Sequence, residues 1–469
     1  MKQIDLMVKH AYLVTMNARR EILTDACIAV DQGSILAVGN DALLSEYQAR
    51  KTIDATGYVV FPGLISTHSH LFQTMLKGLG RDKQLIDWLD SSIRVALHNY
   101  DEETVYYAAL NGCLEAIHSG TTTILDYMYC HPIPGLDECV TRAFDEIGIR
   151  GVLGRSYSDV KKYPPSIACP MVETEQDFLD TVRRLELLYR DHPRIGLCIA
   201  PGIIWDHTDD GFREIRRLAD ELHIPITMHL DETPEDDEFS QAHYGEDTIP
   251  HLERLGILGP DFIAVHCVQL KAADLDTFKR FDVKVSHNPN SNMILASGVP
   301  PIPALLDKGV TVSLACDGSA SNDTQNMLEV LKAASLMQKV YHRDPSLMPA
   351  ASVLEMATLG GAKALGRQDS LGSIEPGKKA DFFLYTPYSP YSTPVLDPVN
   401  SLLYSSSPDS IKTVVIEGRI VLEDGRMTTI DEEKVAWETQ RLAVRLVEKS
   451  GLGNLQWGQK VPLLYGARP

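Results

Sequence analysis

Between about residues 63 and 366, short apolar runs of β type alternate with amphipathic helical patterns. The helical pattern EQDFLDTVRRLELLYRDH is followed by the apolar run RIGLCIAPGI, and GFREIRRLADELH is followed by IPITMHL. Strands that alternate with helices indicate parallel βαβ units. About eight such units over roughly 300 residues predict an α/β fold, a (β/α)8 TIM-like barrel rather than an open sheet.

The two ends of the chain have a different pattern. Residues 4–60 and the late runs KKADFFLYTP and IKTVVIEGRIVLEDGRM are rich in β-forming residues and are interrupted by glycine turns. We therefore expect one small β-sandwich domain that is built from both chain ends. The expected division is a β-sandwich from residues 1–62 and 369–430, a barrel from 63–368, and a C-terminal helix with its tail from 431–469.

The composition limits which partners the protein can bind and in which compartment we expect it. A formal net charge of −20 argues against nucleic acid and anionic membrane surfaces as partners. No apolar run approaches the roughly 18 residues that span a bilayer, and the first residues alternate and carry charge, unlike a signal peptide. The 8 cysteines are scattered without a Cys-x-x-Cys pair. We expect a cytoplasmic protein without a disulfide framework.

Ionisable residues fall where the predicted barrel strands end. His68 and His70 end the first predicted barrel strand, after the run VVFPGLIST, and His229 closes the run IPITMH. His266 ends the run FIAVH, and Asp317 ends TVSLACD. The active site of a (β/α)8 barrel lies at the C-terminal ends of its strands. These five side chains are therefore expected to face one common site.

The residue types at these positions predict a metal site. Three imidazoles and one carboxylate suit one divalent ion, zinc or alternatively iron, and leave a position open for water. The metal lowers the pKa of that water, so that hydroxide attacks the substrate near neutral pH. Glu232, three residues after His229, is placed to carry a proton to a leaving amine. Asp317 can take the proton of the water, and His266 can hold or polarise it. The predicted metal ligands are His68, His70, His229 and Asp317.

The order of these motifs resembles the amidohydrolase superfamily over nearly the whole chain. The resemblance rests on PGLISTHSH, HLDE, HC, ACDGSASND and LGSIEPGKKADFFL. FPGLISTHSHLFQTMLKG and SHNPNSNMILASGVPPIPALLDKG are similar to its aminohydrolase branch, which includes guanine, 8-oxoguanine, isoxanthopterin and S-adenosylhomocysteine deaminases and the s-triazine hydrolases. The resemblance implies a single metal on the four predicted ligands, with Glu232, His266 and Asp317 as the catalytic residues. No lysine ends RIGLCIAPGI, so the chain lacks the bridge of two-metal relatives.

Four further residues are expected to contact the substrate. The resemblance places Gln73 opposite the heterocycle, where its amide offers both a donor and an acceptor. Trp88 is suited to stacking on a flat ring, and Arg155 to holding a carbonyl or a carboxylate. Ser321 follows the metal aspartate at the rim of the pocket. For each of them a structural role stays open: a polar loop residue, an apolar anchor or an ion pair.

One position departs from the nucleoside-type members of this branch. Those that resemble S-adenosylhomocysteine deaminases usually carry a histidine after the proline of the fourth strand. This chain has Gly202 at that place, in APGIIWDHT. The difference favours a small heterocycle over an adenosine derivative.

The sequence thus predicts a mononuclear metal-dependent aminohydrolase, acting on a C–N bond of a cyclic amidine. The expected substrate is a small nitrogen heterocycle of purine, pterin, pyrimidine or triazine type. Two alternatives stay open: an s-triazine hydrolase that releases chloride or an alkylamine, and a non-catalytic scaffold, although no predicted ligand is missing. The other expected partner is the chain itself, as a homodimer or higher homo-oligomer.

Overall fold

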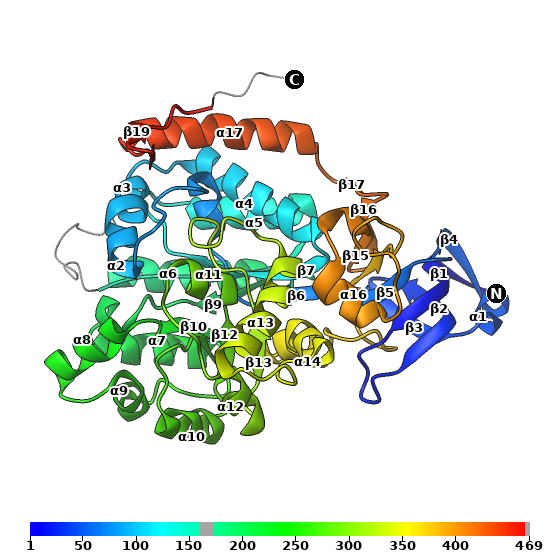
Figure 1. Cartoon of the computed structure of the whole chain (residues 1–469), viewed down its shortest axis with the longest axis horizontal. Helices are drawn as coiled ribbons and strands as arrows, with labels where there is room; N and C mark the ends of the chain where they lie inside the picture. Colours follow the sequence, from blue (N-terminus) through cyan, green and yellow to red (C-terminus); the bar gives the residue numbers. More distant parts are fainter. Residues whose placement is uncertain (160–172, 465–469) are drawn as a thin grey trace.

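The computed structural model describes residues 1–159 and 173–464. Figure 1 shows a barrel surrounded by helices and, on the right, a separate sheet that carries the N-terminus. Helix α17 (Glu432–Lys449) lies on the outside of the barrel against α4 (Glu102–His118). Arg445 of α17 is ion-paired with Asp101, the residue that caps α4, at 2.8 Å.

The described residues contain a barrel of eight parallel strands that follow one another in chain order, as predicted. Two backbone hydrogen bonds close it just beyond the first and last strands, from Thr67 N to Leu314 O and from Asp317 N to His68 O, each 3.2 Å. The strands are β6 (Leu64–Ser66), β7 (Thr121–Met128), β8 (Arg150–Arg155), β9 (Ile195–Ile199), β10 (Ile226–Leu230), β11 (Phe262–His266), β12 (Lys284–His287) and β13 (Val312–Leu314).

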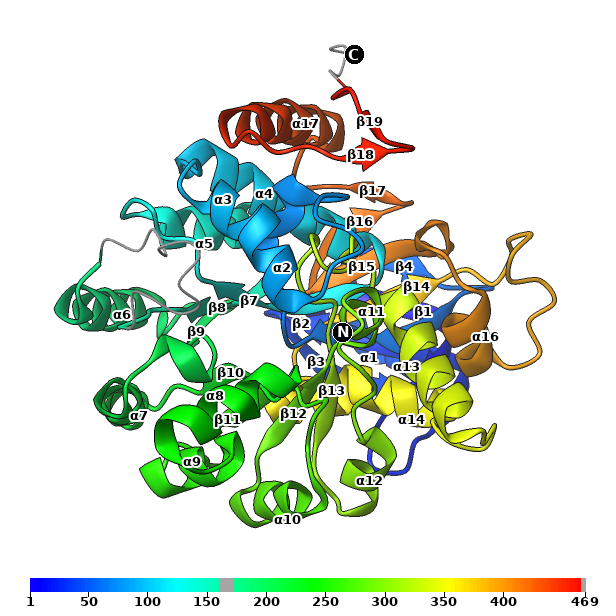
Figure 2. The same cartoon turned by 60° about the vertical axis from the view of Figure 1, so that its left-hand side comes forward.

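Helices cover the outside of the barrel (Figure 2). Local sequence sets where they begin: Thr174 and Asp177 form a reciprocal capping box at the start of α6, and the Thr208 hydroxyl accepts the Gly211 N–H in the first turn of α7. The main covering helices are α4, α5 (Leu136–Ile147), α6 (Glu175–Tyr189), α7 (Asp209–Leu222), α8 (Pro234–Tyr244), α9 (Thr248–Leu255), α10 (Ala272–Phe281), α12 (Ile302–Asp307) and α13 (Met327–His342).

Strands from both chain ends form one separate β domain, as expected. Within the described residues nine strands form a single mixed sheet, ordered β17-β16-β15-β14-β5-β1-β2-β3, with β4 paired to β1. The sheet curls around one core, because Ile35 of β3 and Val415 of β15 belong to the same buried cluster. Its strands are β1 (Lys2–Val14), β2 (Ile22–Asp31), β3 (Ser34–Gly39), β4 (Tyr47–Asp54), β5 (Val59–Pro62), β14 (Phe382–Tyr385), β15 (Ile411–Ile416), β16 (Arg419–Glu423) and β17 (Arg426–Met427).

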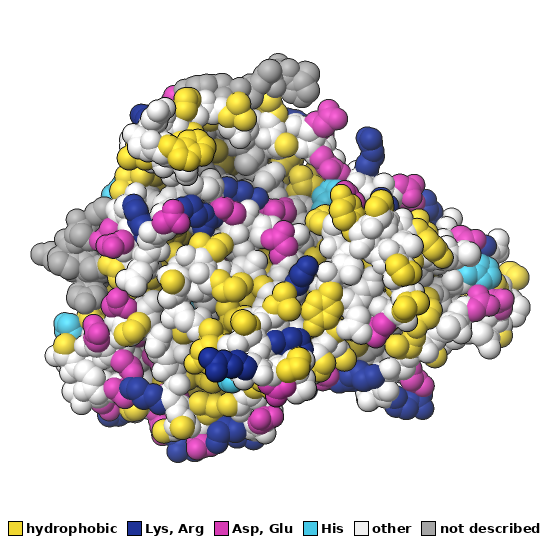
Figure 3. Space-filling model, in the orientation of Figure 1, with side chains coloured by type: hydrophobic (Ala, Val, Ile, Leu, Met, Phe, Trp, Pro, Cys, Tyr) yellow, Lys and Arg dark blue, Asp and Glu magenta, His cyan; other side chains and the backbone are white. Residues whose placement is uncertain are grey.

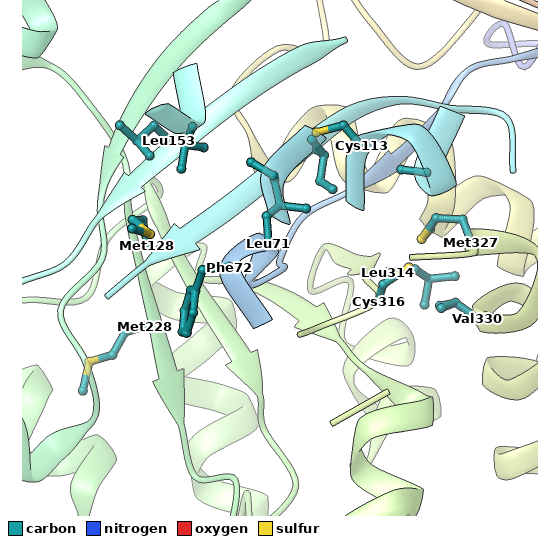
Figure 4. Packing of buried hydrophobic residues seen from close by; sticks show 14 of the residues in the cluster. Leu71, Phe72, Cys113, Met128, Leu153, Met228, Leu314, Cys316, Met327 and Val330 are labelled. Carbon is teal, nitrogen blue, oxygen red and sulfur yellow. The ribbon is translucent and has the colours of Figure 1, made fainter. Parts of the chain in front are cut away.

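Apolar packing holds the segment that follows the two predicted histidine ligands. Figure 4 shows Leu71 and Phe72, from the short helix η1 (Leu71–Leu76), together with Met128 of β7 and Met228 of β10. All four side chains are fully buried, and all belong to one hydrophobic cluster. Burial of this kind stabilises by about 1.5–3 kcal/mol per large side chain, so the segment is firmly anchored.

The helices, charged side chains and thiols of the described residues bear on the sequence expectations about partners and compartment. None of its helices combines the length and apolar character needed to cross a membrane. Acidic and basic side chains are interspersed over the face seen in Figure 3. Seven cysteines are free and buried. The eighth, Cys169, lies outside the described residues.

Candidate active site

The four predicted metal ligands meet at the C-terminal end of the barrel. His68 and His70 lie in the segment just after β6, rather than on the strand itself as the sequence analysis assumed. His229 is the fourth residue of β10, and Asp317 lies three residues beyond β13. His68, His70 and Asp317 are buried, and His229 is partly buried. Two of the four come from the loop after β6, one from β10 and one from the loop after β13.

The spacing of the ligand atoms fits one small divalent ion. His70 Nε2 is 3.2 Å from His229 Nε2, and Asp317 Oδ1 is 3.3 Å from His68 Nε2 and 3.5 Å from His70 Nε2. Two ligands that each bind zinc at about 2.1 Å lie about 3.4 Å apart in a tetrahedral site. Neither ring nitrogen of His68 has a hydrogen-bond partner among the described residues. This donor set therefore suits a metal ion better than an internal hydrogen-bond network.

Backbone carbonyls orient two of the imidazoles. His70 Nδ1 donates to the carbonyl of Tyr127 at 2.8 Å, and His229 Nδ1 donates to that of Gly202 at 3.2 Å. A ring nitrogen that donates in this way leaves the lone pair of the other nitrogen free for a metal. Burial lowers the pKa of His68 to about 4 and that of His70 to about 3. Both rings are therefore neutral, as ligands must be, at physiological pH.

Glu232 and His266 lie beside the ligands. Glu232 Oε2 is 3.5 Å from His266 Nε2, and its Oε1 accepts a hydrogen bond from Ser297 Oγ at 3.2 Å. His266 Nδ1 donates to Asn292 Oδ1 at 2.9 Å, while its Nε2 lies 4.0 Å from Asp317 Oδ2. Burial raises the pKa of Glu232 above its usual value. A carboxyl group that holds its proton more tightly is suited to passing it on.

Backbone strain accompanies these side chains. Asp231, His266 and Asp317 have φ angles of 48°, 73° and 67°, respectively, in the left-handed region that non-glycine residues rarely occupy. Each lies at or just past the end of a barrel strand. Strain of this type persists where the surrounding structure enforces it, most often at functional sites. Here it turns the chain sharply as each strand delivers a polar side chain to the centre.

A cavity of about 140 Å³ opens at the C-terminal end of the barrel. Its inner wall holds His70, His229, Glu232, His266 and Asp317. The outer wall is largely apolar and includes a segment of short helices: α2 (Leu85–Trp88), η2 (Leu89–Ile93) and α3 (Arg94–Leu97). Of the four predicted substrate contacts, Gln73, Trp88 and Ser321 line this cavity.

Two of these three residues also have partners in the protein. Gln73 Nε2 donates to the hydroxyl of Tyr129 at 2.8 Å, and its Oε1 accepts from Ala320 N at 3.4 Å. Ser321 Oγ donates to Asp317 Oδ2 at 3.2 Å. Gln73 therefore orients Tyr129, whose hydroxyl accepts this hydrogen bond at the wall of the cavity. Ser321 helps to orient the carboxylate of Asp317.

Arg155 lies away from the position predicted for it. It is not among the described residues that line the cavity. Its guanidinium pairs with Asp137 at 2.8 Å and with Glu173 at 2.6 Å, and its side chain is only 3% exposed. Two carboxylates satisfy a buried guanidinium, so the geometry gives Arg155 a structural role. The ion-pair alternative of the sequence analysis describes it better than substrate binding.

Several other residues line the cavity that sequence reasoning did not single out. They include Tyr129, Arg94, Trp205 and Asp206. A usable signal existed for Tyr129, which follows Tyr127 by two residues at the end of the strand TTTILDYM and thus points to the same side. No comparable signal marked Trp205 and Asp206, because they lie on the short helix η3 (Ile204–Asp206) after β9. Arg94 belongs to the outer helices, whose position relative to the barrel is set by tertiary packing.

A buried carboxyl group next to this site provides a pH-dependent prediction. Asp126 Oδ1 accepts from the N–H of Leu71, the residue after His70, at 2.7 Å, and burial raises the pKa of Asp126 from 3.8 to about 7. Between these values the folded state holds a proton that the unfolded state has lost. Stability therefore falls as pH rises from about 4 through 7, by up to about 4 kcal/mol. Asp126→Asn keeps the acceptor and removes the titration.

We expect the melting temperature of Asp126→Asn, relative to wild type, to rise by several degrees between pH 5 and pH 8. Thermal unfolding of both proteins across this range measures the effect. Parallel pH profiles for the two proteins would contradict it. Asp210→Asn, on the exposed surface of α7, is the matched control because its side chain is 95% exposed.

Known proteins are similar to this chain in sequence and architecture. The sequence model of the Amidohydrolase family matches residues 59–421. A 5-methylthioadenosine/S-adenosylhomocysteine deaminase of Syntrophus aciditrophicus is 33% identical over 450 residues, which cover 96% of this chain and 99% of that protein. A 5'-deoxyadenosine deaminase of Methanothermobacter thermautotrophicus is 36% identical over 425 residues, 89% of this chain and 94% of its own.

Solved structures agree on the fold. An adenosine deaminase of Xanthomonas campestris with bound zinc superposes with a TM-score of 0.88 at 28% identity, covering 95% of this chain and 99% of that one. The atrazine chlorohydrolase TrzN of Arthrobacter aurescens, at 24% identity and a TM-score of 0.85, covers 93% of this chain and 100% of its own and shows the fold alone. The family match spans most of the chain, both barrel and flanking strands. The chain therefore belongs to the amidohydrolase family.

Proposed function

We propose that the chain is a mononuclear metal-dependent aminohydrolase that releases ammonia from an adenosine-type heterocycle. The observation that carries the proposal is the convergence of three imidazoles and one carboxylate beside Glu232 and His266, at the inner wall of one cavity. The relatives of about a third identity are deaminases of adenosine derivatives by name. These similarities support the reaction class.

In this proposal His68, His70, His229 and Asp317 hold one divalent ion, whose chemistry is to lower the pKa of water. Zinc is the proposed ion, supported by the zinc-bound structure of the related adenosine deaminase. Iron is the alternative for the same ligand types.

The remaining residues move protons and hold the water. Asp317, which lies 4.0 Å from His266 Nε2, takes a proton from the attacking water, and His266 holds that water through its Nε2. Asn292 keeps the opposite ring nitrogen protonated. Glu232 delivers a proton to the amino group, so that the C–N bond breaks with ammonia as the leaving group. The water oxygen stays on the ring carbon as a carbonyl.

Gly202 and the relatives point to different substrates. The glycine favoured a small heterocycle in the sequence analysis, whereas the relatives act on nucleosides by name. We propose the nucleoside class first, because identity extends over nearly the full length of those relatives. Pterins, free purines, pyrimidines and triazines are the competing classes.

A substrate panel tests this proposal. Purified protein loaded with zinc is incubated with aminated nucleosides, purines, pterins, pyrimidines and triazines, and ammonia and product mass are measured. Release of ammonia from an adenosine derivative, with a mass gain of one unit, supports the proposal. Chloride or alkylamine release from triazines alone would establish the alternative hydrolase, and no reaction with any compound would favour the scaffold.

We also propose a cytoplasmic homo-oligomer, in which α17 and the barrel surface offer contact areas. Seven free, buried cysteines among the described residues support a reducing compartment. The expected result of light scattering at micromolar concentration is a particle at least twice the 52.0 kDa of one chain. A 52.0 kDa particle would contradict the prediction.

A further inference from the structure

Asp206 occupies space that a side chain at position 202 would otherwise fill. A Cβ atom placed on Gly202 would lie 1.7 Å from Asp206 Oδ2, closer than any real contact. The same oxygen accepts a hydrogen bond from Ile203 N at 3.1 Å, which fixes the carboxylate over the glycine. The glycine that departs from the nucleoside-type pattern is therefore the residue that admits an acidic group to this wall of the cavity.

The carboxylate faces the cavity with one oxygen still available. Asp206 lines the cavity, and no described residue donates a hydrogen bond to its Oδ1. Neighbours on this outer wall include Leu89, Ile93 and Ile203, which are apolar. The other charged residue on the wall among those described, Arg94, is paired with Asp90. A carboxylate facing an apolar cavity is costly unless a donor reaches it, so a ligand with a donor complements the site.

Asp206 lies where it can contact the end of a substrate that is opposite the reacting amino group. The carbonyl of Gly202 accepts a hydrogen bond from Nδ1 of the metal-site residue His229 at 3.2 Å. Gly202 therefore contacts both the inner wall and Asp206. A substrate whose amino-bearing carbon lies at the inner wall would direct its opposite end toward Asp206. In an adenosine the ring nitrogen N9 carries the sugar, so the adenine ring offers no donor apart from its amino group, whereas the ribose offers hydroxyl donors.

We propose that Asp206 is a specificity-determining residue whose carboxylate accepts hydrogen bonds from donor groups at the far end of the substrate. In an adenosine-type substrate these donors are the ribose hydroxyls, an assignment that rests on the proposed function. A hydrogen bond to a charged group discriminates by about 10- to 100-fold, because a substrate without the donor leaves the carboxylate unpaired.

A matched pair of substrates tests this role. We compare kcat/KM for adenosine and 2',3'-dideoxyadenosine in wild type, Asp206→Ala and Asp206→Asn, with zinc content and melting temperature measured on each. Wild type is expected to prefer adenosine by about 10- to 100-fold, the range for a charge-assisted hydrogen bond. Asp206→Ala should lose this preference through a lower rate on adenosine alone. Asp206→Asn retains an acceptor for Ile203 N. Its preference for adenosine should lie between that of wild type and that of Asp206→Ala.

Two results would overturn the proposal. An unchanged preference in Asp206→Ala removes Asp206 from substrate recognition, and an equal loss on both substrates in Asp206→Asn assigns it a structural role. If wild type deaminates neither nucleoside, the proposed nucleoside class fails instead. The same variants are then compared on the panel compound that reacts, in N–H and N-methyl forms, where an unchanged ratio again overturns the role of Asp206. Asp210→Asn serves as the surface control.

Discussion

Glu232→Gln is expected to lower the rate of ammonia release by roughly 10²-fold or more, the usual contribution of a general acid–base residue. The substitution keeps the size of the side chain and its acceptor oxygen for Ser297 Oγ. It removes the proton that a leaving amine needs. Because Glu232 is not one of the four proposed ligands, the metal content should stay at the wild-type value.

The leaving group sharpens this prediction. Chloride leaves without a proton, so Glu232→Gln should slow release of chloride from a chlorinated ring much less than release of ammonia, if both substrates react. Rates for both leaving groups in wild type and variant measure the difference. Small and equal losses would remove Glu232 from proton transfer. Glu238→Gln, on the exposed face of α8, is the control and should behave as wild type.

Removal of the metal is expected to abolish turnover and to lower thermal stability. The chain should bind about one divalent ion, because three imidazoles and one carboxylate complete a single mononuclear set. Without the ion, the ligand atoms, which lie 3.2–3.5 Å apart, lose the partner that they share. A ligand bound to the folded state alone stabilises by about 4 kcal/mol at 1,000 times its dissociation constant.

Elemental analysis, activity and thermal unfolding before and after chelation measure these effects, and added zinc should restore all three. His68→Gln should reproduce the chelated protein, while His98→Gln, an exposed histidine, should match wild type. Asp317→Asn should cost more activity than Glu232→Gln, since it weakens a ligand and removes a base. The two losses should not add, because both residues act on one proton path. Two tightly bound ions per chain would refute the mononuclear site.

The barrel was predictable because its signal is repeated and local. Each strand-helix unit carries its own change of hydrophobic period, and the positions at strand ends follow from the fold. His229 and His266, which lie on β10 and β11, could therefore be placed from the pattern alone, whereas Asp317 lies three residues beyond β13. The exact location of His68 and His70 could not, because the strand ends at Ser66 and the loop carries both rings inward.

The outer cavity wall was harder to predict because tertiary packing decides it. Arg155 lies on a strand, and its position alone does not say whether its guanidinium contacts substrate or carboxylates. Tertiary packing brings Glu173 to it. Asp206 lines the cavity only because Gly202 leaves room for it. Neither contact has a period or a motif that marks it in the sequence. The β domain from both chain ends was predicted, but not its strand order, in which hydrogen bonding between β5 and β14 joins the two ends into one sheet.

The shared sheet has a consequence for how the protein is made. Strand β5 ends at Pro62, and its partner β14 begins at Phe382, so roughly 320 residues separate them. At about 5–20 residues per second, a ribosome needs on the order of half a minute to supply the second strand. During that interval β5 presents an unpaired apolar edge, a template for aggregation. Holdase chaperones are therefore expected to raise the soluble yield most when they engage nascent chains that lack the last 90 or so residues.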